Sequence, residues 1–324
     1  MTLIGGMLPA SCRRVYRVKS DFLTPRVSIP ALVAALCFVG GAFGSAAVVV
    51  DVASSTPNWI AISYTGSNPD PSGDQQTGGG EGDIVGNLSH PSAYTAFGNA
   101  GTPSLTDGTI GFRVRVGADS NPPGFDGALM VGIDANRDGA LDLFIGVNNS
   151  GSQAIIAIWN PGTGLNISPS TTTIGNTALV SYAETSANYS YTAVTLSIDP
   201  SVGTATDINA DGKNDYFLSF SVPFNDVVAQ LAARGITGFT EDTPLSYVVA
   251  TSTQGNSLNQ DLNGVPKTYD PASGWAALGA NSNTISSSGV YAVPEPGTGA
   301  LLLSAAACGA IRSRPRKRRA AVAR

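Results

Sequence analysis

Short apolar runs recur along this chain, and turn-forming residues close each of them. The runs are rich in β-branched and aromatic residues, are bounded by Gly, Pro, Asn, Asp and Ser, and lie at 59–64, 110–116, 129–133, 143–147, 154–159, 191–198, 216–222 and 247–251. Many short strands separated by turns are typical of a β-sandwich or jelly roll. The pattern predicts an all-β fold, a single sandwich or jelly-roll-like domain over residues 48–292.

One run shows the alternation of a strand with one face in the core. Phe112, Val114 and Val116 alternate with Arg113 and Arg115. Successive side chains of a strand point to opposite faces of the sheet, so we expect the apolar residues to be buried and the two arginines to face solvent.

Two segments depart from the strand pattern. One predicts the single short helix of the domain, with Asn225 or Asp226 as its N-cap, an apolar side after it, and Gly235 as its end. The other, residues 66–83, contains Pro-Asp-Pro and Gly-Gly-Gly. That composition predicts a flexible loop or linker.

The N-terminal segment has the order of a secretory signal peptide. Five basic residues precede an apolar run that begins at Ile29, and small residues at 44 and 46, or at 45 and 47, suit cleavage. We therefore predict that residues 1–47 are a signal peptide. A permanent anchor is the alternative, but glycines interrupt the run, which falls short of the roughly 20 strongly apolar residues of a stable span.

The C-terminal segment combines a short motif, an apolar stretch and a basic tail. The motif is formed by Val293, Pro294, Glu295 and Pro296, and the basic tail contains Arg312, Arg314, Arg316, Lys317, Arg318 and Arg319. Such cations prefer the cytoplasmic side of a membrane and stop export. Residues 293–324 resemble the PEP-CTERM sorting signal of bacterial exosortase substrates. The resemblance implies a hydrophobic sorting helix that anchors the chain transiently, cleavage by an exosortase-like enzyme, and release or attachment at the cell surface or extracellular matrix.

Charge separates the ends of the chain from its middle. Of 18 basic residues, 12 lie in the terminal segments, and residues 48–292 keep six against 21 acidic residues, a balance of −15. Such a body repels nucleic acid and attracts cations. All three cysteines also lie in the terminal segments. A disulfide framework and a cysteine nucleophile are therefore excluded for the body.

Two nine-residue segments, 134–142 and 207–215, share the pattern Asp-x-Asn-x-Asp-Gly-x-x-Asp, and an apolar run follows each. Oxygens at relative positions 1, 3, 5 and 9 converge when such a loop wraps, and Gly at position 6 permits the sharp turn. The predicted metal ligands are Asp134, Asn136, Asp138 and Asp142, and Asp207, Asn209, Asp211 and Asp215. Hard oxygen ligands favour Ca²⁺, with the weak dissociation constants of extracellular modules, about 10⁻⁴ to 10⁻³ M.

The two segments resemble the calcium loops of thrombospondin type 3, dockerin and integrin-type propeller repeats. The resemblance implies the ligand pattern alone, because an EF-hand needs a Glu at position 12, where Ile145 and Leu218 stand here. We expect each loop to be a turn that joins two strands. The alternative is an Asp/Asn/Gly-rich turn that binds no metal.

The body has few candidates for catalysis. His90 is the only histidine, and no G-x-S-x-G motif accompanies it, which disfavours a Ser-His-Asp triad and a histidine-ligated zinc. Glu81, Glu184 and Glu241 stand in polar contexts, whereas the general acid of a glycosidase needs apolar surroundings that raise its pKa. We predict that the protein is not an enzyme.

Polysaccharide binding is the alternative to a calcium-stabilised structural or adhesive role, and a glycan-degrading enzyme ranks below both. Trp59 and Trp159 are expected in the core, which leaves Trp275 as the tryptophan expected to be exposed for stacking on sugars. A polar cluster that follows a predicted strand is a further candidate site lining, and it consists of Asn256, Asn259, Gln260 and Asp261. A hydrogen-bonded loop explains that cluster equally well.

Overall fold

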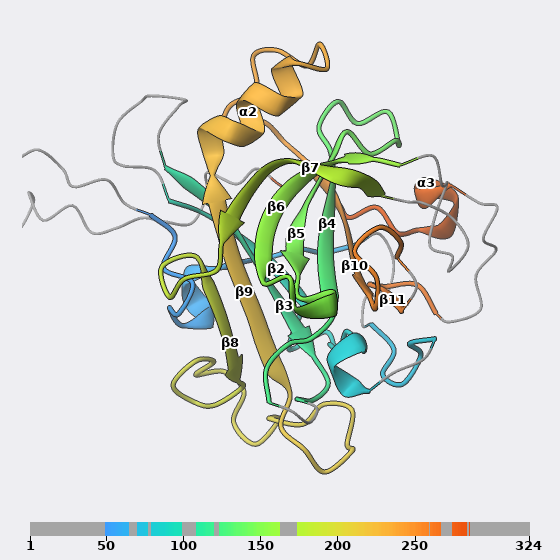
Figure 1. Cartoon of the computed structure of the whole chain (residues 1–324). Helices are drawn as coiled ribbons and strands as arrows, with labels where there is room; N and C mark the ends of the chain where they lie inside the picture. Colours follow the sequence, from blue (N-terminus) through green and yellow to red (C-terminus); the bar gives the residue numbers. More distant parts are fainter. Residues whose placement is uncertain are drawn as a thin grey trace, which may run out of the picture. The chain divides into compact units, whose positions relative to one another are not determined.

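Two antiparallel sheets make up most of the structure (Figure 1). This computed structural model describes residues 49–64, 70–76, 79–98, 108–119, 123–162, 174–258, 260–266, 274–283 and 285. The first sheet has the order β1 (Ile60–Ala61), β2 (Ala93–Gly98), β3 (Thr109–Val116), β9 (Tyr216–Pro223), β8 (Tyr189–Ala193). The second has the order β11 (Asp261–Leu262), β10 (Ser246–Ser252), β4 (Ala128–Asp134), β5 (Leu143–Asn148), β6 (Ile155–Pro161), β7 (Ile174–Ala183). The described helices are η1 (Thr56–Asn58), η2 (Gly80–Gly82), η3 (Ser150–Ser152), α2 (Phe224–Ala232) and α3 (Trp275–Leu278).

The two sheets share one apolar core. Phe112 of β3 and Phe220 of β9 lie opposite each other in register, with ring centroids 5.6 Å apart. Tyr247 of β10 meets Phe112 edge-on from the other sheet, with 5.5 Å between the centroids. Val131 of β4 and Ile145 of β5 are buried in the same cluster. The inner faces of both sheets therefore pack as in a β-sandwich, which confirms the predicted all-β fold for the described residues.

Most predicted strands occur with small shifts at their ends. The runs 110–116, 129–133, 143–147, 154–159, 216–222 and 247–251 correspond to β3, β4, β5, β6, β9 and β10. The runs 59–64 and 191–198 form strands over part of their length, as β1 and β8. The pattern does not predict β2 and β7, because small and polar residues interrupt their apolar positions.

The expectation that Arg113 and Arg115 face solvent is wrong. Both side chains are 0 % exposed, although they point away from the core between the sheets. The guanidinium of Arg113 donates to the backbone oxygens of Val52 and Ser54 and lies over the ring of Trp59, 4.5 Å from its centroid. The alternation gives the direction of each side chain correctly, but other segments of the chain cover the outer face of the first sheet.

The predicted helix occurs as α2, with an earlier start. Its N-cap is Pro223, so the expectation of Asn225 or Asp226 at that position is wrong. The reason is that β9 runs directly into the helix through Pro223, whose φ of −57° already suits the turn. Gly235 follows the helix with a φ of +83°, as expected of a helix end. Within the described residues, no helix has the length and hydrophobicity needed to cross a membrane.

The described part of the segment 66–83 is not a flexible linker, which corrects that expectation. Asp70, Glu81 and Asp83 are all buried. The hydroxyl of Thr251 in β10 donates to the backbone oxygen of Gly82 at 2.6 Å. The segment therefore packs onto the β10 side of the second sheet, because its polar groups find partners there.

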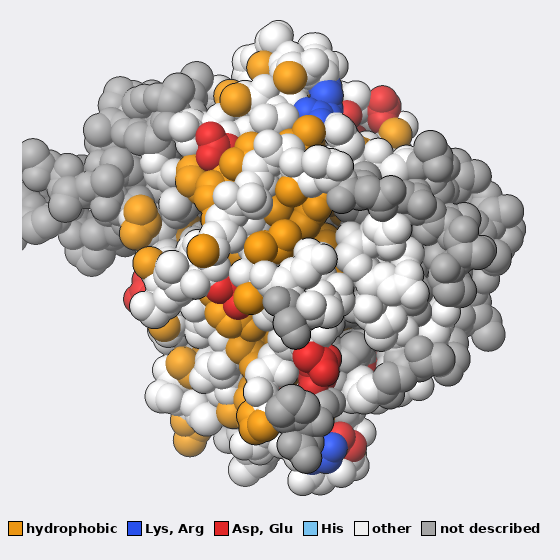
Figure 2. Space-filling view, viewed as in Figure 1, with side chains coloured by type: hydrophobic (Ala, Val, Ile, Leu, Met, Phe, Trp, Pro, Cys, Tyr) orange, Lys and Arg blue, Asp and Glu red, His pale blue; other side chains and the backbone are white. Residues whose placement is uncertain are grey.

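Hydrophobic side chains form a band across the face shown in Figure 2. The band lies where β7 and β8, the edge strands of the two sheets, border the core. Leu179 and Val180 of β7 and Tyr189 and Tyr191 of β8 are partly buried against that core. This edge of the sandwich is therefore less completely covered than the faces that carry the two arginines and the segment 66–83.

Candidate functional site

The first Asp-rich loop connects β4 to β5, as expected. Asp134 is the last residue of β4, and the backbone N–H of Asp142 donates to the oxygen of Ile133 at 2.7 Å. Asp134 is buried, Asp142 is half-buried, and Asn136 and Asp138 are exposed. The candidate ligands thus extend from a buried base to an exposed tip of a hairpin loop.

The second Asp-rich loop lies at the end of the longer connection 194–215, which joins the paired strands β8 and β9. Asp207 and Asn209 are half-buried, Asp211 is exposed and Asp215 is 0 % exposed. This loop is therefore anchored more deeply at its C-terminal end than the first.

The two loops have the same backbone hydrogen bonds at the same relative positions. The Asp at position 1 accepts from the N–H groups of positions 5 and 6, at 3.2 and 3.0 Å in the first loop and 3.2 and 2.9 Å in the second. The Asn at position 3 accepts from position 5, at 2.9 and 3.3 Å. The Asp at position 5 accepts from position 7, at 2.9 and 2.8 Å, and the Asp at position 9 accepts from position 2, at 2.8 and 3.0 Å. The shared pattern therefore produces one loop geometry from two different sequences.

The backbone of both loops is left-handed at positions 4 and 6. Gly139 and Gly212 at position 6 have φ values of +89° and +85°, which glycine adopts freely. Arg137 and Ala210 at position 4 have φ values of +62° and +57°. For residues with a Cβ this conformation costs about 1–2 kcal/mol, and such strain is often retained at ligand clamps.

Asp215 of the second loop also belongs to a buried ion pair. Arg115 Nη2 lies 2.7 Å from Asp215 Oδ2, and both side chains are fully buried. Burial raises the pKa of Asp215 to about 6, although the charge of Arg115 acts to lower it. The second oxygen, Oδ1, is buried and has no hydrogen-bond partner in the described part of the chain. That oxygen can therefore face a cation.

The remaining carboxylates of the loops can bind a cation while they hold the backbone. A carboxylate has about four lone pairs, so an oxygen that accepts one N–H can still contact a metal. Burial raises the pKa of Asp134 and of Asp142. A cation would offset this cost of burial, because it stabilises the ionised form of both groups.

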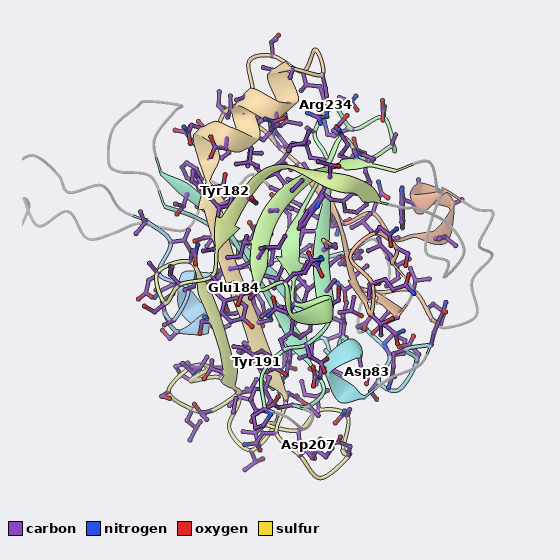
Figure 3. All side chains as sticks on the ribbon, viewed as in Figure 1. Asp83, Tyr182, Glu184, Tyr191, Asp207 and Arg234 are labelled. Atoms are coloured by element: carbon purple, nitrogen blue, oxygen red, sulfur yellow. The ribbon has the colours of Figure 1, made fainter. Side chains whose placement is uncertain are left out.

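The structure keeps the two loops apart. Figure 3 labels Asp207 of the second loop at one end of the sandwich and Arg234 at the other. Arg234 lies near the first loop, since the charge of Asp142 acts on its guanidinium. The eight predicted ligands therefore form two separate candidate sites.

A third group of carboxylates has no counterpart in a local sequence motif. Asp70, Asp74 and Asp261 each place one oxygen within 4.8 Å of the other two, and among the described residues neither Asp-rich loop forms such a group. Asp261 and the neighbouring Gln260, which the sequence marks as part of a polar cluster, are both buried. Asp70 and Asp74 lie far earlier in the chain, so residue spacing gives no signal for them.

The expected exposure of Trp275 is wrong. Trp275 is only 7 % exposed, because α3 turns it into an apolar cluster with Leu141 and Phe144 on the outer side of the second sheet. Trp59 and Trp159 are buried, as expected. A cavity of about 240 Å³ lies beside Glu81 and Asp126, among other residues, and is smaller than the roughly 300–1,000 Å³ of usual ligand pockets.

Several predicted residues lie outside the described residues. They are the signal peptide at 1–47, Asn259, the motif Val293, Pro294, Glu295 and Pro296, and the basic residues Arg312, Arg314, Arg316, Lys317, Arg318 and Arg319. In comparisons with known proteins, no family model, curated protein or solved structure matches the chain. Function is therefore inferred from the residues and their geometry.

Proposed function

We propose that the chain is an exported cell-surface or extracellular-matrix protein, stabilised by calcium, with a structural or adhesive role. Residues 1–47 are the signal peptide, residues 48–292 are a single extracellular domain of sandwich or jelly-roll type, and residues 293–324 are a PEP-CTERM sorting signal. The secretion machinery and an exosortase-like enzyme are its partners. The C-terminal segment holds the chain in the membrane transiently before the protein reaches the surface.

The matched geometry of the two Asp-rich loops is the observation that carries the calcium assignment. Both loops bend the backbone at the same positions, strain included, and in both the position-1 carboxylate accepts the backbone N–H of position 5. In addition, Asp215 Oδ1 is buried with no hydrogen-bond partner among the described residues. Hard oxygen ligands of this kind suit Ca²⁺, and the strongly acidic body attracts cations.

Cleavage at the sorting motif tests the location. Glu295→Ala in the full chain, expressed in a bacterium that has an exosortase-like enzyme, is expected to leave most of the protein uncleaved in the membrane fraction. Thr298→Ala, just outside the motif, is the matched control and is expected to behave as the wild type. Fractionation and immunoblotting measure both. Equal cleavage of the two variants would contradict the assignment of residues 293–324.

The first loop is expected to bind Ca²⁺ about tenfold more tightly than the second, a difference of about 1.4 kcal/mol. Each loop has three aspartates and one basic residue, Arg137 or Lys213, but Arg115 neutralises one aspartate of the second loop. Affinity in such sites rises with the number of charged ligands. Asp138→Ala and Asp211→Ala, compared by calorimetric titration of the full chain, should remove the tighter and the weaker loop site respectively. The reverse order would show that the ion pair does not set the affinity.

Polysaccharide binding is the alternative role for the same domain. All three tryptophans are buried, so none of them offers a surface for stacking on sugars. Co-sedimentation of the full chain with insoluble matrix polysaccharide in millimolar Ca²⁺ separates the two roles. We expect the protein to stay in the supernatant, and calcium-dependent sedimentation would favour the alternative.

A further inference from the structure

Three carboxylates gather at a place that neither Asp-rich loop reaches. Asp70 and Asp74 come from the segment 70–76, and Asp261 is the first residue of β11. Asp70 and Asp261 are each 2 % exposed, and Asp74 is half-buried. Figure 3 labels Asp83, whose charge also acts on Asp70 and Asp261, in this part of the molecule.

Backbone donors hold two of these carboxylates in place. Asp261 accepts the N–H of Ile84 on Oδ2 at 2.6 Å and the N–H of Leu262 on Oδ1 at 2.7 Å. Asp70 accepts the N–H of Gly264 on Oδ1. Hydrogen bonds to both oxygens of a carboxylate favour its ionised form. These two hydrogen bonds favour the ionised form of Asp261, whereas its burial beside two further acidic groups opposes ionisation.

The described basic residues supply no counter-ion to the two buried carboxylates. Neither Asp70 nor Asp261 forms an ion pair with a described Lys, Arg or His. Asp70 Oδ2 is buried and has no hydrogen-bond partner in the described part of the chain. Burial, and after it the neighbouring carboxylates, raises the pKa of Asp70 and of Asp261 well above the usual range. Buried carboxylates of this kind are stable when they are paired or coordinate a metal.

We propose that Asp70, Asp74 and Asp261 bind a Ca²⁺ ion at a third site, independent of the two loops. A Ca–O distance of about 2.4 Å lets one Ca²⁺ ion contact oxygens up to about 4.8 Å apart. All three oxygens meet the calcium limit. The site offers oxygen alone, which suits a hard cation rather than a transition metal.

The ion clamps the segment 70–76 onto the second sheet. Asp70 and Asp74 belong to that segment, and Asp261 pairs with β10 through β11. The backbone N–H of Gln76 donates to the backbone oxygen of Gln260 at 2.8 Å, so the two parts of the chain already contact each other beside the carboxylates. Binding therefore ties together two parts of the chain that are distant in sequence.

Asp74→Asn tests the site. It removes one carboxylate from the group, and Asp74 is the most exposed of the three residues, so the substitution disturbs the fold least. We use the full chain with the loop substitutions Asp138→Ala and Asp211→Ala as the parent, and Ca²⁺ alone as the probe. Equilibrium dialysis should find one bound Ca²⁺ in the parent, and Asp74→Asn should weaken that binding at least tenfold. In EDTA the same substitution should raise the melting temperature, since it relieves repulsion between like charges, and in millimolar Ca²⁺ it should lower it.

Asp242→Asn, an exposed residue outside the group, is the matched control and should change neither binding nor melting. Asp70→Asn is the second variant, since its amide oxygen can still accept the N–H of Gly264, and it should also lose the ion. The proposal would be overturned if calcium binding were unchanged and the melting temperature rose both in EDTA and in millimolar Ca²⁺. That result would mean that shared protons, and not a bound ion, offset the repulsion between the carboxylates. If the two Asp-rich loops bind no calcium, the wild type and the parent will bind equal amounts of Ca²⁺, so this outcome is distinguishable from loss of the third site.

Discussion

Replacing Arg115 with methionine is expected to destabilise the folded chain by about 3–5 kcal/mol. The guanidinium donates to Asp215 from Nε at 2.7 Å and to the backbone oxygen of Ala205 from Nη2 at 2.6 Å, with both charged side chains fully buried. Methionine keeps much of the apolar length but leaves the carboxylate of Asp215 buried without its cation. Urea unfolding of the full chain in EDTA measures the effect without any contribution from bound calcium.

A second substitution isolates the buried charge as the cause. Asp215→Asn in the Arg115→Met background removes the unpaired charge and is expected to restore most of the lost stability. Lys213→Met removes an exposed cation of the same loop and is expected to change stability by no more than about 0.5 kcal/mol. A loss below about 1 kcal/mol for Arg115→Met would contradict this account, because it would show that Asp215 does not remain an unpaired buried charge in the folded state.

The sequence predicts those parts of the fold that depend on local patterns. The run Leu143–Val147 is largely apolar and two asparagines follow it, and it forms β5 almost as expected. By contrast, Gly, Asn, Thr and Ser interrupt the apolar residues of β7 without a regular alternation, so β7 lacks a clear strand signal and is defined by its pairing with β6. Strand pairing supplies hydrogen bonds whatever the side chains are, and a single sequence does not record it.

The buried arginines show a different limit of the sequence. The alternation in β3 is the same whether its polar face meets water or another part of the chain. Here the connection after β8 supplies Ala205 and Asp215, and the start of the described chain supplies Val52, so the arginines find acceptors distant in sequence. Such partners become visible only after the chain has folded.

The candidate sites also differ in whether local sequence or contacts between distant residues define them. The two Asp-rich loops are contiguous, so their shared geometry follows from nine residues and could be predicted, down to the left-handed turn at Gly139 and Gly212. The group at Asp70, Asp74 and Asp261 depends on β11 meeting the segment 70–76, and the glycine- and proline-rich composition around that segment indicated a linker instead. Only Asp261 carried a signal, as one of several polar residues after a predicted strand.

Calcium at 5 mM is expected to raise the free energy of unfolding of the full chain by about 2–5 kcal/mol through the two loops. Dissociation constants of about 10⁻⁴ to 10⁻³ M give about 1–2.3 kcal/mol per site, because the native state alone binds the ion. For a domain of this size the gain corresponds to a rise in melting temperature of roughly 4–20 °C relative to EDTA. Thermal melts followed by circular dichroism measure the shift, and Mg²⁺ at the same concentration should produce much less of it.

Variants show which residues cause the calcium-induced rise in melting temperature. Asp138→Ala with Asp211→Ala should remove the contribution of both loops, whereas Asp51→Ala with Asp242→Ala, two exposed aspartates, removes the same charge and should keep the full shift. Comparing shifts within each variant cancels the loss of the backbone hydrogen bonds that Asp138 and Asp211 accept. If the loop variant keeps a calcium-induced rise in melting temperature of the size expected for one site, that rise is assigned to Asp70, Asp74 and Asp261. An unchanged shift would make both loops metal-free turns, and the strain at Arg137 and Ala210 would then be offset by the carboxylate hydrogen bonds alone.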